Sequence, residues 1–165
     1  MLINKMTPYP AAAFGAGIVS GVVSTLAQVA LWWLFAENSW LWMLNRDARL
    51  AAAIVMGQDV LPTSATLDWQ VMAVATLIHF TLSIAYSLAF AFMVSRLDAR
   101  FWLAAGFIYG LAIYAANMYG MTFIFPWFTQ ARDWITVLAH IVFGTSLADA
   151  YKKLSRRRLR GFTRE

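Results

Sequence analysis

Apolar residues run through the chain in four long stretches, and most of the polar residues gather between them. The stretches cover residues 11–36, 71–95, 101–125 and 134–151. Only the last one carries a charge, Asp149, near its end. A helix needs roughly 20 apolar residues to cross the hydrocarbon core of a bilayer. The pattern therefore predicts an all-α integral membrane protein whose four transmembrane helices form a bundle, a single domain over residues 1–151.

The insertion between the first two stretches, about residues 37–70, carries a helical pattern of its own. Over residues 40–56 there are few helix breakers, and apolar positions alternate with charged ones such as Arg46 and Asp47. Gly57 is expected to end this helix. Such a helix either lies on the outer surface of the membrane as an interfacial helix or acts as a lid over the outer mouth of the bundle.

Lysine and arginine lie mostly on one side of the four predicted spans. That side holds ten of the thirteen: Lys5, Arg96, Arg100, Lys152, Lys153, Arg156, Arg157, Arg158, Arg160 and Arg164. Because positive charge stays on the cytoplasmic side, both termini are predicted to be cytoplasmic. The first stretch is longer than the apolar core of a signal peptide, so we expect it to be retained.

The spans also show traces of an internal repeat. The first span laid on the third matches Gly17 with Gly106, Gly21 with Gly110 and Gln28 with Asn117, and the second laid on the fourth matches His79 with His140. Both hairpins run from inside to outside and back. The sequence therefore predicts two parallel-repeat hairpins related by an axis along the membrane normal. The four glycines allow close helix approach and are expected to serve packing.

One strongly polar side chain falls in each span at a similar depth. Gln28, His79, Asn117 and His140 all lie roughly 9–12 Å below the predicted outer boundary, at about 1.5 Å per residue. Such groups are expected to face inward and pair. Three roles stay open: a hydrogen-bonded packing layer, a binding or proton-handling site, or axial ligation of a b-type haem by the two histidines.

The C-terminal segment, residues 152–165, is predicted to be a basic cytoplasmic tail. Attraction to anionic lipid explains its cluster of cations, and we expect no nucleic-acid partner beside a membrane. The residues expected to contact anionic lipid are Lys152, Lys153, Arg156, Arg157, Arg158 and Arg160. Asp149, one helical turn away, is expected to pair with Lys152 or Lys153.

Composition agrees with this assignment and narrows the function. Hydrophobic residues make up 61% of the chain and charged residues 13%, against about 25% charged in soluble domains. There is no cysteine, so thiol catalysis and thiolate metal sites are excluded. No P-loop, dinucleotide fingerprint, nucleophile elbow or His-Glu-x-x-His motif occurs, and no acidic residue is expected at the depth of the histidines to orient either as a base. We expect no enzyme, no metal and, outside the haem interpretation, no cofactor.

Several of these segments resemble a family. The stretch LIHFTLSI at 77–84, the segment AGFIYG at 105–110, His140 and the basic run at 152–160 resemble the YagU-like small bacterial inner-membrane proteins. The resemblance covers roughly residues 67–158. It implies a bacterial inner-membrane protein linked to acid tolerance, and it assigns no catalytic or binding residue.

A second resemblance lies in the outer insertion. The segment RDARLAAAIVMG at 46–57 is similar to short bacterial membrane proteins catalogued as sodium:proline symporters. Symporters of that class need many more spans, inverted repeats and broken helices, which four short spans do not supply.

The sequence thus predicts a non-enzymatic small inner-membrane protein that responds to protons or serves as an accessory subunit of a membrane complex. A haem-binding electron-transfer or sensor subunit is the first alternative, and an oligomeric conduit for a small solute or protons is the second. A homo-oligomer or a partner in a membrane complex is compatible with the glycine faces.

Overall fold

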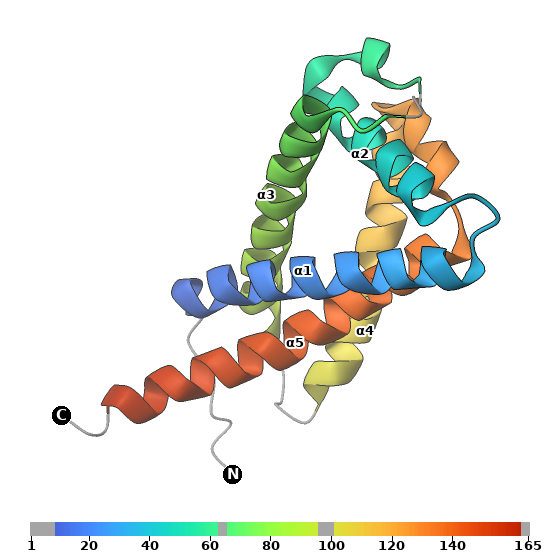
Figure 1. Cartoon of the computed structure of the whole chain (residues 1–165). Helices are drawn as coiled ribbons and strands as arrows, with labels where there is room; N and C mark the ends of the chain where they lie inside the picture. The colour runs from blue at the N-terminus through green and yellow to red at the C-terminus, as the bar shows by residue number, and fades with distance from the viewer. Residues whose placement is uncertain (1–8, 63–65, 96–100, 163–165) are drawn as a thin grey trace.

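The part of the chain that the structure describes is all-helical, with four long apolar helices and a shorter one between the first two of them (Figure 1). The computed structural model describes residues 9–62, 66–95 and 101–162, the last six as backbone only. The long helices are α1 (Pro10–Phe35), α3 (Trp69–Val94), α4 (Trp102–Ala115) with its continuation to Phe123, and α5 (Trp134–Phe162). Each is long and apolar enough to cross a membrane, which confirms four candidate spans at the predicted places.

Two boundaries differ from the sequence expectation. The third span is α-helical only to Ala115 and continues as a π-helical turn, Ala116–Gly120, and a 3-10 turn, Met121–Phe123. The last helix does not end near residue 151 but continues through the basic segment to Phe162. The length of the apolar stretches predicted neither feature. It does not distinguish one helix type from another, and it does not show whether a helix continues beyond the apolar stretch.

The shorter helix α2 (Trp40–Met56) begins and ends where the sequence predicted. Ser39 caps it by accepting a hydrogen bond from the Trp42 amide at 3.2 Å, and Gly57 ends it with a φ of 87°, which favours glycine. Its buried face packs Ala48 and Ala52 on α3. A location at the membrane surface stays a prediction, but α2 buries its small residues against the protein.

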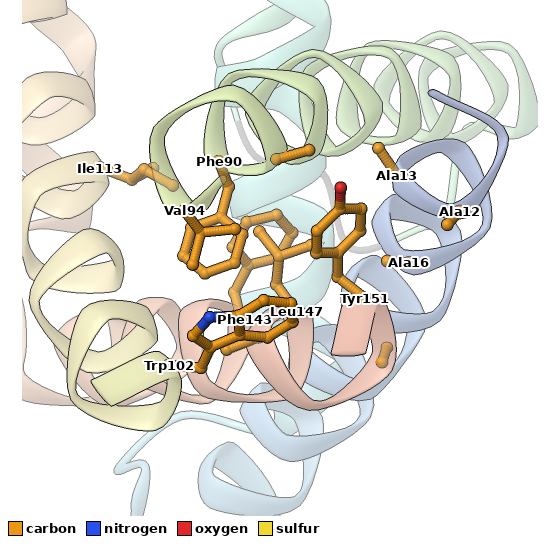
Figure 2. Packing of buried hydrophobic residues seen from close by; sticks show 13 residues of the cluster. Ala12, Ala13, Ala16, Phe90, Val94, Trp102, Ile113, Phe143, Leu147 and Tyr151 are labelled. Atoms are coloured by element: carbon orange, nitrogen blue, oxygen red, sulfur yellow. The ribbon is translucent and has the colours of Figure 1, made fainter. Parts of the chain in front are cut away.

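The largest hydrophobic cluster joins one end of all four long helices. Figure 2 shows Phe90, Trp102, Phe143, Leu147 and Tyr151 packed together where α1 begins, α3 ends, α4 begins and α5 continues. The rings of Trp102 and Tyr151 stack with their centroids 5.8 Å apart. Helices that alternate in direction bring these four ends together, so the first and last helices approach each other at this end.

The predicted hairpins are present, and glycine sets the distance between their helices. A Cβ atom on Gly17 would lie 2.9 Å from the Ser83 carbonyl oxygen of α3, and one on Gly106 would overlap the Gly144 carbonyl of α5. Gly21 lies against His79 and Phe80, and Gly110 against His140 and Ile141. The two hairpins therefore cross at matching positions, and Gly144 joins the four glycines that the sequence singled out.

The two hairpins are not packed symmetrically on each other. The helices α1 and α5 pack along each other extensively, whereas α3 and α4 hardly meet. Among the polar contacts between α3 and α1, the Ser87 hydroxyl donates to the Ala13 carbonyl at 2.6 Å. Toward the other end α1 and α3 diverge, and α2 lies in the opening between them (Figure 1).

We expect Gly110→Ala to destabilise the protein by about 1–3 kcal/mol, because the added methyl group would collide with the His140 backbone and push α4 from α5. Gly120→Ala is the matched control, since nothing lies within 4 Å of a Cβ atom there. Thermal unfolding of both variants in the same detergent tests this. Equal losses in the two variants would contradict the close approach.

Candidate functional site

Polar side chains from all four long helices line one partly open cavity of about 140 Å³. The four residues that the sequence placed at a common depth, Gln28, His79, Asn117 and His140, are all among them. The sequence did not single out the other polar residues of the lining, which are Ser24, Ser83 and Tyr86. Liquid water occupies about 30 Å³ per molecule, so the cavity has room for about four.

A directional chain of hydrogen bonds crosses one side of the cavity. The Tyr86 hydroxyl of α3 donates to Oδ1 of Asn117 at 2.5 Å, and Nδ2 of Asn117 lies 3.4 Å from Nε2 of His140. Nδ1 of His140 lies 2.8 Å from the Thr136 carbonyl oxygen. Because a carbonyl only accepts, Nδ1 carries the proton and Nε2 accepts from the Asn117 amide. The chain thus runs from α3 through the third span to α5.

The π-helical turn places Asn117 in this chain. Residues 116–120 form i→i+5 rather than i→i+4 hydrogen bonds, and the third span changes helix type at this turn. Turns of this kind recur at functional sites. Arg132, just before α5, holds the same segment, since its Nε donates to the Met118 carbonyl at 2.7 Å and its guanidinium lies 4.4 Å from the Tyr119 ring centre.

His79 lies against the first helix instead. Its Nε2 is 3.3 Å from the Gly21 carbonyl oxygen and 3.3 Å from the Thr25 hydroxyl. Glycine at position 21 allows this contact, because a Cβ atom there would lie 3.2 Å from the imidazole. No hydrogen bond joins His79 to His140 in the described part of the chain, so the two histidines belong to different interhelical contacts around the same cavity.

A second hollow, of about 320 Å³, lies between α1, α2 and α3, and we call it the α1–α2–α3 groove. Its walls are mostly apolar, and Gln28 and His79 line both the groove and the cavity. The apolar residues of its lining are Val22, Leu26, Trp32, Leu44, Ala48, Ala51, Met72, Ala75 and Phe80. Two polar residues of this lining, Gln28 and His79, therefore stand between the groove and the polar cavity.

One acidic residue contacts this layer at Gln28, a contact that the sequence did not predict. Asp47 of α2 lines the α1–α2–α3 groove, and its Oδ2 accepts a hydrogen bond from Nε2 of Gln28 at 3.2 Å. Depth could not be counted for a residue in the outer insertion, because α2 folds back between α1 and α3. Among the described residues Asp47 is hydrogen-bonded to neither histidine, so it orients neither as a base.

Asp47 belongs to a small charged cluster. Nη2 of Arg46 lies 2.7 Å from Oδ1 of Asp47 and 3.6 Å from Oδ2 of Asp133, which also caps α5 through the Thr136 amide. Burial raises the pKa of Asp47 to about 6, and the neighbouring Arg46 guanidinium only partly offsets that effect. The carboxyl therefore titrates near neutral pH beside an apolar groove.

The predicted lipid-contact residues lie away from the cavity. Lys153 pairs with Asp149 at 2.6 Å across one exposed helical turn, which confirms the expected ion pair. Lys152 and Arg156 lie on the same helix, α5. Other basic positions fall outside the described residues, namely Lys5, Arg96, Arg100 and Arg164, and so do the side chains of Arg157, Arg158 and Arg160. Contact with anionic lipid stays a prediction for all of them.

The site does not fit the haem interpretation. Small-molecule pockets hold on the order of 300–1,000 Å³, and the cavity between the histidines holds about 140 Å³. The Nε2 atom that would bind the iron is engaged with Asn117 in one histidine and faces Gly21 in the other.

We expect the contribution of Asp47 to the stability of the protein to fall as pH rises from about 4 to about 6, because the folded state holds the Asp47 proton more tightly than the unfolded state does. The stabilisation is complete below the unfolded value of 3.8 and is lost through about 6, and it amounts to at most about 3 kcal/mol. Asp47→Asn removes this slope, whereas Asp59→Asn, at an exposed carboxylate, keeps it. Unfolding midpoints measured from pH 4 to 7 test this, and an unchanged slope in Asp47→Asn would contradict it.

Comparison with known proteins gives no family for this chain. No protein-family model, no curated protein and no solved structure matches it. The resemblance to the YagU-like proteins therefore stays a prediction, and the function rests on the geometry of the cavity and the groove.

Proposed function

We propose that this chain is a non-enzymatic multi-pass membrane protein whose intramembrane cavity responds to protonation. The observation that carries the proposal is the bonding of His140, which donates through Nδ1 to a carbonyl and accepts through Nε2 from the Asn117 amide. An imidazole held between one acceptor and one donor changes its bonding when it gains a proton. Histidine is also the side chain that titrates nearest to neutral pH.

Protonation of His140 would reverse the hydrogen-bond chain. With a proton on Nε2, two donors would face each other across the 3.4 Å between Nε2 and Nδ2 of Asn117. Rotation of the Asn117 amide by half a turn would turn Oδ1 toward His140 and Nδ2 toward the Tyr86 hydroxyl, which can accept. The Tyr86 proton would then have to find an acceptor elsewhere in the cavity.

The reversal would change hydrogen bonds on three helices at once. Tyr86 lies on α3, Asn117 on the π-helical turn and His140 on α5. His140 is also where the backbones of α4 and α5 meet at Gly110. A change in the bonding of one imidazole can therefore alter how the third span packs on its neighbours, which is the kind of two-state element that a proton switch needs.

The remaining features support a small inner-membrane protein built from a repeated hairpin. Basic residues lie mostly on the side of the termini, which favours cytoplasmic termini. In the first hairpin Gly21 of α1 lies against His79 of α3, and in the second Gly110 of α4 lies against His140 of α5. These residues occupy matching positions in the two hairpins, as a parallel repeat would require. The polar groups of the layer are engaged in interhelical hydrogen bonds, and this favours a sensory or accessory role over catalysis.

The test is a pH titration of stability in the Asp47→Asn background, which removes the separate titration of that carboxyl. We expect the unfolding midpoint to fall by roughly 2–4 °C or more between pH 8 and pH 5, because imidazolium loses its acceptor role toward Asn117. His140→Gln keeps an amide at the position of Nε2 without a titrating ring, so the step should vanish. His79→Gln is the control that keeps the step.

Two results would refute the proposed switch. One is a step that survives in His140→Gln, since the titrating group would then lie elsewhere. The other is a step that disappears in His79→Gln alone, which would move the proton site to the contact between α3 and α1.

A further inference from the structure

The α1–α2–α3 groove joins an apolar surface to a carboxylate. Its walls come from three helices and are mostly aliphatic or aromatic, with Trp32 and Phe80 as the aromatic members. Its polar residues are Thr25, Gln28, Asp47, Thr76 and His79. A molecule bound there would rest its apolar part on these walls and place a polar head beside Asp47.

The charges around Asp47 decide which head group would fit. Two carboxylates, Asp47 and Asp133, share the single Arg46 guanidinium, at 2.7 Å and 3.6 Å. The other helices packed on this point contribute neutral or titratable groups, Gln28 from α1 and His79 from α3. With His79 neutral, the cluster carries a formal charge of −1, so it disfavours an anionic head group and favours a cationic one.

Because Asp47 is largely buried, the preference for a cationic head group is stronger than it would be at an exposed ion pair. The Asp47 side chain is 22% exposed, and burial disfavours its ionised form even with Arg46 in contact. An ionised carboxylate that one guanidinium does not fully compensate gains from a second cation nearby. Aromatic faces in the lining add cation–π attraction for a weakly hydrated cation.

We propose that the α1–α2–α3 groove binds a lipophilic cation, an amine or quaternary ammonium with an apolar body, and that Asp47 holds its charged head. A volume of about 320 Å³ is at the lower end for small-molecule sites, so it suits a compact head and a short length of hydrocarbon. The proposal goes beyond the His140 switch and does not depend on it, because no step of it requires His140 to change its protonation.

Cation and proton would compete for the same carboxylate. With the pKa of Asp47 at about 6, the carboxyl is mostly ionised at pH 7 and mostly neutral at pH 5. For one competing proton, the apparent dissociation constant of the cation should rise about tenfold between pH 7 and pH 5. Binding of a neutral molecule of the same tail length should change little over this range.

The experiment measures binding of dodecyltrimethylammonium and of dodecanol, its neutral counterpart, to the full chain in nanodiscs of zwitterionic phosphatidylcholine. Isothermal titration, corrected with empty nanodiscs, gives both dissociation constants at pH 7 and pH 5. We expect saturable binding of the cation alone, about tenfold weaker at pH 5. Asp47→Asn should weaken cation binding at least tenfold at pH 7, and the exposed Asp59→Asn should leave it unchanged.

Further variants keep the result interpretable if Asp47→Asn does not fold. Asp47→Glu retains the carboxylate and should retain binding, whereas Ala51→Leu fills the apolar wall and should weaken it without removing charge. Equal affinity for dodecanol, partition no greater than into empty nanodiscs, or no loss at pH 5 in the unmodified protein would each overturn the proposal. None of these results affects the proposed His140 switch, because that switch is tested in protein in which Asp47 has already been replaced by Asn.

Discussion

The rest of the structure depends on the close approach of helix backbones at glycine. Where Gly106 and Gly110 face Gly144 and His140, no side chain separates α4 from α5, so the two backbones touch. Between helices in lipid there is no hydrophobic driving force, so packing of this kind would hold the candidate spans together. The same contact fixes the depth of His140 relative to Asn117, and Gly21 does the same for His79 against α1. The polar layer is therefore a consequence of where the glycines lie.

Much of the fold could be predicted because hydrocarbon thickness and backbone hydrogen bonding leave few choices. The positions of the candidate spans, the limits of α2 and the meeting of Gln28, His79, Asn117 and His140 at one cavity all followed from apolar length and from counting at a fixed rise per residue. Counting works only along a continuous helix that crosses the membrane. It therefore failed for Asp47, whose place depends on how the outer insertion folds back between α1 and α3.

The change of helix type in the third span also could not be predicted from the sequence. Nothing in the segment Ala-Asn-Met-Tyr-Gly distinguishes a π-helical turn from an ordinary one, since the choice depends on partners from elsewhere in the chain. Those partners are Tyr86 and His140 on the two sides of Asn117, and Arg132 on the carbonyl of Met118. The hydrogen bonds that they supply lie within the segment that departs from α-helical geometry. Tyr86 was missed for the same reason, because its role appears only when α3 meets the third span.

The groove and the cavity share Gln28 and His79 in their linings, and this has an energetic consequence. Gln28 donates to Asp47, so any change in the charge of that carboxyl changes the strength of a hydrogen bond made by a residue of the cavity lining. Coupling between two sites is reciprocal in free energy, so the state of the cavity must act on the groove by the same amount. Salt screens exposed charges far more than partly buried ones, so the effect should persist at physiological ionic strength. The apolar groove, its carboxylate and the polar cavity form one electrostatic unit, although five helices of the chain contribute to it.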